Sequence, residues 1–329
     1  MRPRVHSGIA IAVLLGVAVV VGASGGRAAG SATPPEPAEV RLSALVTDPL
    51  LAEISGIAES RRRAGVLWVE NDSGNPADLY AIDTGGHRLA TVHVDGARNI
   101  DWEDLAAFEL DGKPYVLVGD IGDNGGRQHD LELYVLAEPD LAAATVEHPL
   151  ELTRKPAWII EARWPDGARD CEALAVDVQR REVLLMSKRR VPPELFRLRL
   201  DPPRRNEGVR IAEQVGFAYS LPQASPEEQA AAKGIARIRH QVTAIDLSPD
   251  GRRLAVLTYD GAFLYDRSAG ADWAEVLRGT PQRIALPPIP QAEALAFSRD
   301  AGTLWISSEK LPAPLLQVEL PAPANAPRH

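Results

Sequence analysis

Five short segments of the sequence resemble one another, and each is followed by a turn and then by two further apolar runs. In every segment the second residue carries a side-chain oxygen and the fourth is Ile or Leu. The segments are residues 54–58, 102–106, 171–175, 242–246 and 292–296. Short apolar strands separated by turns rich in Gly and charged residues are typical of an all-β fold. Repetition of such units is typical of the blades of a β-propeller.

The spacing of these segments predicts a single propeller over residues 40–320, built from five blades with a WD40-like repeat. The steps from Ile57 to Leu105 and from Ile245 to Leu295 match a four-stranded blade, whereas the two steps between them are longer. The extra length is expected to hold further strands, such as residues 157–160, and a helix that Ser225 caps and that runs to about Ile235. A sixth blade within these insertions is the alternative.

The last unit lacks a fourth strand ahead of a Pro-rich tail, residues 321–329, which we expect to be disordered. Residues 40–45 precede the first unit and have the composition of a strand. We expect this strand to complete the last blade, because pairing the two ends of the chain would close the ring and leave no exposed sheet edge.

The first 30 residues have the pattern of a secretory signal peptide: Arg2 and Arg4 precede an apolar run, and small residues follow. Residues 31–39 form a Pro- and Ala-rich linker that we expect to be disordered. The protein is therefore expected to be secreted or periplasmic. It would contact a membrane only through the signal segment, and only if that segment is retained as an anchor.

The charge of the chain argues against a nucleic-acid partner. Without Arg2, Arg4 and Arg27, and with no acidic residue before Glu36, the formal net charge changes from −9 to −12. Cys171 is the one cysteine, so an internal disulfide is impossible and stability has to come from the core. Cys171 and Trp102 occupy the same position in their segments and are expected to pack between blades. We expect a monomer.

Acidic residues concentrate where first strands begin and second strands end, and these two points lie at the same end of an antiparallel blade. The second residues of the five segments would then form a ring of oxygens. An oxygen-only ligand set favours Ca²⁺ over Mg²⁺ and argues against zinc. The alternative is a solvated acidic surface. The candidate metal ligands are Asp101, Glu103, Asp104, Asp120, Asp123, Asp170, Glu172 and Glu293.

Basic residues are expected at the same end of the ring, where Lys188, Arg189 and Arg190 follow a second strand. A cation held by carboxylates beside Lys and Arg suits a phosphate ester, since the metal polarises phosphoryl oxygens and Arg binds the anion with two hydrogen bonds. The candidate catalytic residues are Glu103, Glu172, Lys188 and Arg189. The alternative is that the bases only form ion pairs with nearby carboxylates. His240 is a weaker candidate for a general base.

Several motifs resemble those of secreted bacterial β-propellers of the phytase-like, or esterase-like, family. The motifs are residues 71–74, 101–106, 119–124, 170–175 and 187–189. The run Asp170-Cys171-Glu172 is similar to an acidic motif of alkaline β-propeller phytases, in which such carboxylates hold Ca²⁺ in the channel mouth. The resemblance implies a Ca²⁺-dependent phosphoesterase ancestry and carries over to Asp170 and Glu172, and more loosely to Asp101 and Glu103. Those phytases have six blades, whereas five are predicted here.

Two functions follow from these observations. The first is a Ca²⁺-dependent hydrolase acting on a small anionic or ester substrate, either a phosphate ester or a related ester such as a lactone. The second is a non-catalytic extracellular propeller that binds a cell-envelope ligand and uses Ca²⁺ only to stabilise its fold.

Overall fold

The structure, a computed structural model, describes residues 38–127, 130–231 and 237–321. The chain divides into Met1–Pro35 and Glu36–His329, and all described residues belong to the second unit. The predicted signal segment and the predicted tail beyond Pro321 lie outside the described residues. Within the described ranges, no helix has the length and apolar character needed to cross a bilayer.

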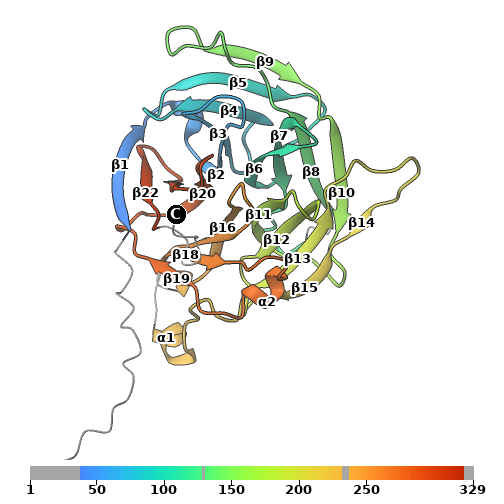
Figure 1. Cartoon of the computed structure of the whole chain (residues 1–329), viewed down its shortest axis with the longest axis vertical. Helices are drawn as coiled ribbons and strands as arrows, with labels where there is room; N and C mark the ends of the chain where they lie inside the picture. The colour runs from blue at the N-terminus through green and yellow to red at the C-terminus, as the bar shows by residue number, and fades with distance from the viewer. Residues whose placement is uncertain (1–37, 128–129, 232–236, 322–329) are drawn as a thin grey trace, which may run out of the picture. The chain divides into compact units, whose positions relative to one another are not determined.

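Five sheets surround a common centre in the second unit (Figure 1). The first blade contains β2 (Ile54–Glu59), β3 (Val66–Asn71), β4 (Asp78–Asp83) and β5 (Arg88–Val94). The second contains β6 (Trp102–Leu110), β7 (Lys113–Asp120), β8 (Asp130–Ala137) and β10 (Trp158–Arg163). The third contains β11 (Cys171–Asp177), β12 (Glu182–Ser187), β13 (Glu194–Arg199) and β15 (Glu213–Phe217).

The fourth blade contains β16 (Val242–Leu247), β17 (Arg253–Thr258), β18 (Gly261–Asp266) and β19 (Gln282–Ile284). The fifth contains β20 (Ala292–Phe297), β21 (Thr303–Ser308), β22 (Ala313–Glu319) and β1 (Glu39–Val46). Two short strands, β9 (Leu150–Arg154) and β14 (Arg210–Ile211), add in parallel to the outer edges of the first and second blades. The remaining elements are η1 (Pro49–Leu51), α1 (Pro226–Ala231) and α2 (Trp273–Val276).

The ring is closed as the sequence predicted. The innermost strands β2, β6, β11, β16 and β20 contact one another in turn, and β20 contacts β2 again. The N-terminal strand β1 pairs antiparallel with β22 from Glu39↔Glu319 to Val46↔Ala313. Both ends of the described chain thus share one sheet, which confirms the five-bladed propeller; the described residues form no sixth blade.

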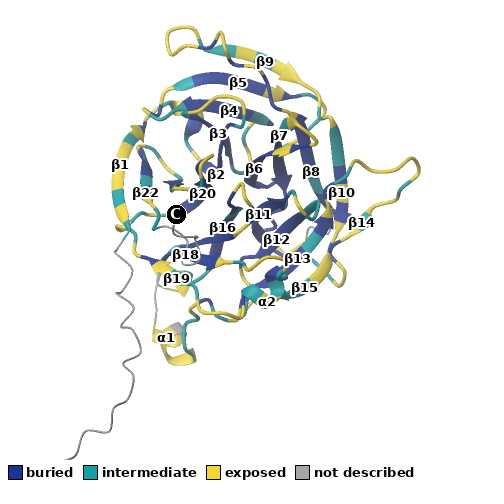
Figure 2. Cartoon of the chain, viewed as in Figure 1, coloured by how far each residue is buried: buried dark blue, intermediate teal, exposed yellow. Residues whose placement is uncertain are grey.

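The core lies between neighbouring blades, because alternate residues of each strand face opposite sides. Trp68, Trp102 and Tyr134 belong to one cluster between the first and second blades, and Cys171 belongs to the next cluster. Trp102 and Cys171 are fully buried, as expected from their shared position in the repeat. Figure 2 shows the inner strands buried and β1 and β9 largely exposed at the rim.

The predicted helix is α1, and its first turn carries a capping box. The backbone N–H of Glu228 donates to Ser225 Oγ at 3.1 Å, and the N–H of Ser225 donates to Glu228 Oε2 at 2.8 Å. These two bonds satisfy donors that a helix leaves unpaired at its N-terminus. The predicted end of the helix, near Ile235, falls in residues 232–236, outside the described residues.

Every inner strand carries a β-bulge at the same place. The pairing with the second strand shifts between Ile54 and Gly56, and equivalent shifts occur in the other four blades. The residues at these shifts are Ser55, Glu103, Glu172, Thr243 and Glu293. They are the oxygen-bearing second residues of the repeated segments. A two-residue alternation therefore does not hold across this position, and the bulge sets the direction of each side chain.

Neighbouring inner strands are also joined by a carboxylate. Asp246 on β16 accepts hydrogen bonds from the N–H of Leu247 at 2.8 Å and from the N–H of Phe297, on β20 of the next blade, at 2.7 Å. Asp104 on β6 accepts from the N–H of Leu174 on β11 in the same manner, at 2.8 Å. The two carboxylates thus act as hydrogen-bond acceptors for strand N–H groups that are not paired with another strand.

The Asp246→Ala variant tests this link between the fourth and fifth blades. The substitution leaves two backbone N–H groups without an acceptor, and we expect it to lower the free energy of unfolding by about 2–4 kcal/mol. Urea unfolding at pH 7 measures the change. The exposed Glu147→Ala is the control and should stay within about 0.5 kcal/mol of wild type; equal stability of the two variants would contradict the role given to Asp246.

Candidate metal centre at one end of the ring

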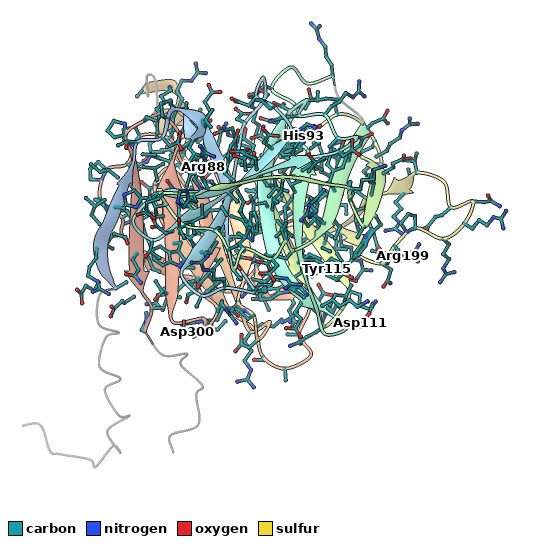
Figure 3. All side chains as sticks on the ribbon, turned by 90° about the horizontal axis from the view of Figure 1, so that it is seen from above. Arg88, His93, Asp111, Tyr115, Arg199 and Asp300 are labelled. Atoms are coloured by element: carbon teal, nitrogen blue, oxygen red, sulfur yellow. The ribbon has the colours of Figure 1, made fainter. Side chains whose placement is uncertain are left out.

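One end of the ring collects the loops that precede first strands and follow second strands, and we call this end the mouth. Figure 3 shows Asp111 and Asp300, in turns between first and second strands, near the opposite end, and His93, close to the end of β5, toward the mouth. The acidic residues at the start of β6 and the end of β7 lie at the mouth, where Trp102 pairs with Asp120.

Five carboxylates of the mouth form two groups that share one member. Asp72, Asp101 and Glu103 each offer an oxygen, and the three oxygens lie within 4.8 Å of one another. The second group consists of Glu103, Asp170 and Glu172, which also offer one oxygen each, and these oxygens lie within 4.8 Å of one another. Neighbouring blades supply them: Asp72 follows β3 of the first, Asp101 and Glu103 belong to the second, and Asp170 and Glu172 to the third. The propeller thus brings together carboxylates that are far apart in sequence.

Glu103, the shared member, has one unsatisfied oxygen. The residue is 2% exposed. Its Oε2 accepts a hydrogen bond from Ser55 Oγ at 3.3 Å, whereas Oε1 has no hydrogen-bond partner among the residues that the structure describes. A buried carboxylate oxygen without a donor is costly unless a proton or a cation compensates it.

Gly122 permits this arrangement. A Cβ atom at Gly122 would lie 2.1 Å from Glu103 Oε1 and 2.7 Å from Oδ2 of Asp101. The N–H of Gly122 donates to the carbonyl oxygen of Asp101 at 3.1 Å, which holds the glycine against the two carboxylates. Only a residue without a side chain at this position therefore leaves room for the carboxylates of Glu103 and Asp101.

The electrostatics of the mouth disfavour a full set of negative charges. Burial, followed by repulsion from Asp72, raises the pKa of Asp101 to about 6. Burial raises the pKa of Glu172 to about 8 although Lys188 opposes the shift. The pKa of Glu103 is raised well above its ordinary value by burial and then by repulsion from Glu172. Such carboxylates take up protons near neutral pH unless a cation compensates them.

Lys188 and Arg189, two of the predicted catalytic residues, reach the mouth and are already paired with carboxylates. The buried Nζ of Lys188 contacts Glu172 and lies 3.7 Å from Glu293 Oε1. Burial alone would lower the pKa of Lys188, but the neighbouring acidic groups, Glu172 first, raise it above its ordinary value. Arg189 Nε lies 2.6 Å from Asp170 Oδ2, and its Nη2 donates to Asn124 Oδ1 at 2.6 Å.

Glu293 lies beside the carboxylate groups but in neither of them. Its Oε1 accepts a hydrogen bond from the hydroxyl of Tyr259. The neighbouring Glu309 has its pKa raised to about 9, first by burial and then by a hydrogen bond with Glu293. Of the remaining members of the predicted ring, Thr243 donates to the carbonyl of Ala292 at 2.8 Å. Of the five second residues, the structure thus brings Glu103 and Glu172 into the carboxylate groups, whereas Thr243 and Glu293 have other partners.

The structure places Asp104, Asp120 and Asp123 outside both carboxylate groups. Asp104 accepts from Leu174, as described above. Asp120 accepts from the N–H groups of Ile100 at 3.1 Å and Asp101 at 3.0 Å, which holds the loop that carries Asp101. The N–H of Asp123 donates to Asp170 Oδ1 at 3.1 Å. These residues position the ligand candidates through the backbone.

Asp72 is the member of the groups that the predicted ligand set left out. It is half-buried and directly follows β3. Its place after a second strand corresponds to that of Lys188 after β12 in the third blade. The sequence signal that could have identified Asp72 as a ligand candidate is its position directly after a second strand, at the mouth end.

A basic cavity of about 270 Å³ adjoins the carboxylates. Among the residues that the structure describes, its charged and titratable lining consists of Lys188, Arg189, Arg190, Arg237 and His240 and includes no acidic side chain. Burial lowers the pKa of His240, so its ring is neutral at pH 7. The cavity has the charge expected of a site for an anionic group.

Comparisons with known proteins do not assign a family. No family model matches the sequence, and no curated protein matches it. The chain is similar to a solved structure, that of U3-55K, with a TM-score of 0.37 and 11% identity over 81% of this chain and 68% of that one. At this level the similarity carries no argument about function, and the resemblance to phytase-like propellers stays a prediction.

The raised pKa values predict how stability depends on pH when no metal is present. The unfolded chain has lost the protons of both groups above about pH 4.5, whereas the folded chain keeps the proton of Asp101 up to its pKa of about 6 and that of Glu172 up to its pKa of about 8. The free energy of unfolding should therefore fall with rising pH, by about 2 kcal/mol or more. Ion-paired carboxylates such as Glu207, with its pKa lowered to about 2, titrate below this window.

The measurement is urea unfolding in a chelator at pH 5, 6, 7 and 8. The Asp101→Asn variant removes one of the titrating groups and should flatten the lower part of the profile, whereas the exposed Glu147→Gln should follow wild type. Stability that rises across the window would contradict the crowding of carboxylates described above.

Proposed function

We propose that the mouth binds Ca²⁺ through Asp72, Asp101, Glu103, Asp170 and Glu172, and that the protein is a metal-dependent hydrolase of phosphate esters or related esters. The observation that carries the proposal is the unpartnered Oε1 of Glu103, buried at the point that two carboxylate groups share. When bound, Ca²⁺ supplies a Lewis acid that polarises the ester and lowers the pKa of a water.

The donor set fits a hard cation. Both groups consist of carboxylates alone, with no Cys or His among them. Ca²⁺ takes six to eight oxygen ligands in flexible geometry, which suits carboxylates contributed by three separate blades. A divalent charge would also offset the repulsion that raises the pKa of Asp101 and Glu103.

The basic cavity supports an anionic substrate. Arg190 and Arg237 line it together with Lys188 and Arg189, whose charges are shared with Glu172 and Asp170. A cation bound to those carboxylates would weaken their hold on both bases. Arg189 and Arg190 would then bind the anionic group of the substrate, and Lys188 would orient it next to Glu172.

A specific observation favours the second candidate function, a non-catalytic propeller that uses Ca²⁺ only to stabilise its fold. Lys188 and Arg189 already have carboxylate partners in the mouth. In that case the bases act as internal counter-ions, and the protein binds a cell-envelope ligand without converting it.

A pair of glycine variants tests the metal site. The Gly122→Ala substitution places a methyl group where Glu103 and Asp101 approach, so Ca²⁺ affinity should fall by about tenfold or more, equal to about 1.4 kcal/mol. Gly125→Ala is the matched control, because its Cβ would lie 3.8 Å from Asp123 Oδ1, an ordinary contact. Isothermal titration with CaCl₂ measures the Ca²⁺ affinity of both variants. Equal affinities would contradict a metal site formed by Glu103 and Asp101 next to Gly122.

A second pair of variants tests hydrolysis. Glu103→Gln removes the shared charge, and we expect Ca²⁺-dependent turnover of 4-nitrophenyl phosphate or 4-nitrophenyl acetate to fall by about 100-fold or more. Glu147→Gln is the control, because this exposed glutamate lies in the loop between β8 and β9 and its substitution should leave turnover unchanged.

Three results are informative. Turnover that needs Ca²⁺ and disappears only in Glu103→Gln supports the hydrolase. Ca²⁺ binding with a raised melting temperature and no turnover of either ester class supports the non-catalytic propeller. No Ca²⁺ binding at all contradicts both.

A further inference from the structure

A second cavity, of about 600 Å³, opens at the mouth end between the fourth and fifth blades. One wall is the loop that follows β19, residues 286–290, with the sequence Leu-Pro-Pro-Ile-Pro. The opposite wall is the turn between β17 and β18, which includes Tyr259. A cavity of this size with a mainly apolar lining falls within the range of small-molecule sites.

The apolar wall is stiff. Three of its five residues are prolines, whose ring fixes φ and whose nitrogen has no hydrogen to satisfy. A wall that is already in its bound shape loses little conformational entropy when a ligand enters. The loop can therefore hold an apolar group without being ordered by it.

The one acidic residue in the lining is already compensated. Asp260 forms an ion pair with Arg239, and its Oδ2 lies 3.0 Å from Arg283 Nη2. The described lining of the cavity thus offers no free charge that would select a cation, in contrast to the carboxylate groups of the mouth.

Tyr259 belongs both to this cavity and to the mouth. Its hydroxyl donates to Glu293, and its ring centroid lies 5.6 Å from Lys188 Nζ. Burial raises the pKa of Tyr259, so the hydroxyl stays protonated and keeps its role as a donor. A group that fills the cavity would therefore lie against the same tyrosine that contacts the Lys188–Glu172 pair.

We propose that this cavity binds the apolar part of the ester whose polar end meets the cation and the basic residues. The inference rests on the proposed function and narrows its substrate class. The substrate is an ester that carries an aromatic or branched aliphatic group, rather than a compact polyanion. Ile289, Leu286 and Tyr259 then determine specificity through contact with that group.

The experiment compares two ligands that differ only in the apolar group. Phenylphosphonate and methylphosphonate are titrated by calorimetry into the Ca²⁺-loaded full chain. Wild type should bind phenylphosphonate at least tenfold more tightly. Ile289→Asp places a charge in the apolar wall and should bring the ratio to within twofold. The ratio is the readout, because the added charge also repels methylphosphonate, and circular dichroism checks that the variant is folded, since Ile289 packs against the core. Val209→Asp, at a 41% exposed apolar residue outside the cavity, is the control and should keep the wild-type ratio.

Equal affinity for the two phosphonates in wild type, or a preference that survives in Ile289→Asp, overturns the proposal. If the mouth binds no Ca²⁺ and neither phosphonate binds, the proposed function fails, and the fluorescence of the neutral probe 2-naphthol tests the cavity by itself. Saturable binding of 2-naphthol that disappears in Ile289→Asp supports an apolar-ligand site. The absence of such binding overturns it.

Discussion

The bulge at the second residue of each inner strand is the constraint on which the mouth depends. In a regular strand, successive side chains point to opposite faces of the sheet. The side chains of Glu103 and Glu172 would then point toward one adjacent blade or the other. The bulge leaves the second residue out of the pairing ladder and turns its side chain. All five blades share this irregularity, and Glu103 and Glu172 are the two second residues that it brings into the carboxylate groups.

Convergence creates an electrostatic problem that the chain solves only in part. Lys188 lies against Glu172 and Glu293, and Arg189 lies against Asp170. Glu103 has no such basic partner within hydrogen-bond distance among the described residues and receives only the hydroxyl of Ser55. The third blade is thus compensated by its own bases, whereas the side of the mouth toward the first two blades is not. This asymmetry is why the proposed cation lies next to Glu103.

Much of the fold could be predicted from the sequence, because strand order in a propeller follows the order of the repeat. The segments around Leu105 and Leu295 gave the inner strands, and residues 40–45 gave the closing strand. Which acids become ligands could not be predicted in the same way. Asp104 stands next to Glu103 in sequence, yet its carboxylate binds the backbone of the next blade. Only the path of the bulged strand separates the two roles, and residue type carries no sign of it.

The mouth also differs from blade to blade in a way that the repeat does not impose. The first three blades contribute the carboxylate groups, the loop between the third and fourth adds basic residues, and the loop between the fourth and fifth adds the Pro-rich apolar wall. Loops at the end of a rigid scaffold tolerate such variation because they leave the core packing unchanged. Carboxylates, bases and apolar surface can therefore be arranged around one centre by a chain whose blades are otherwise alike, and their order around the ring would set which end of the proposed substrate meets the proposed cation.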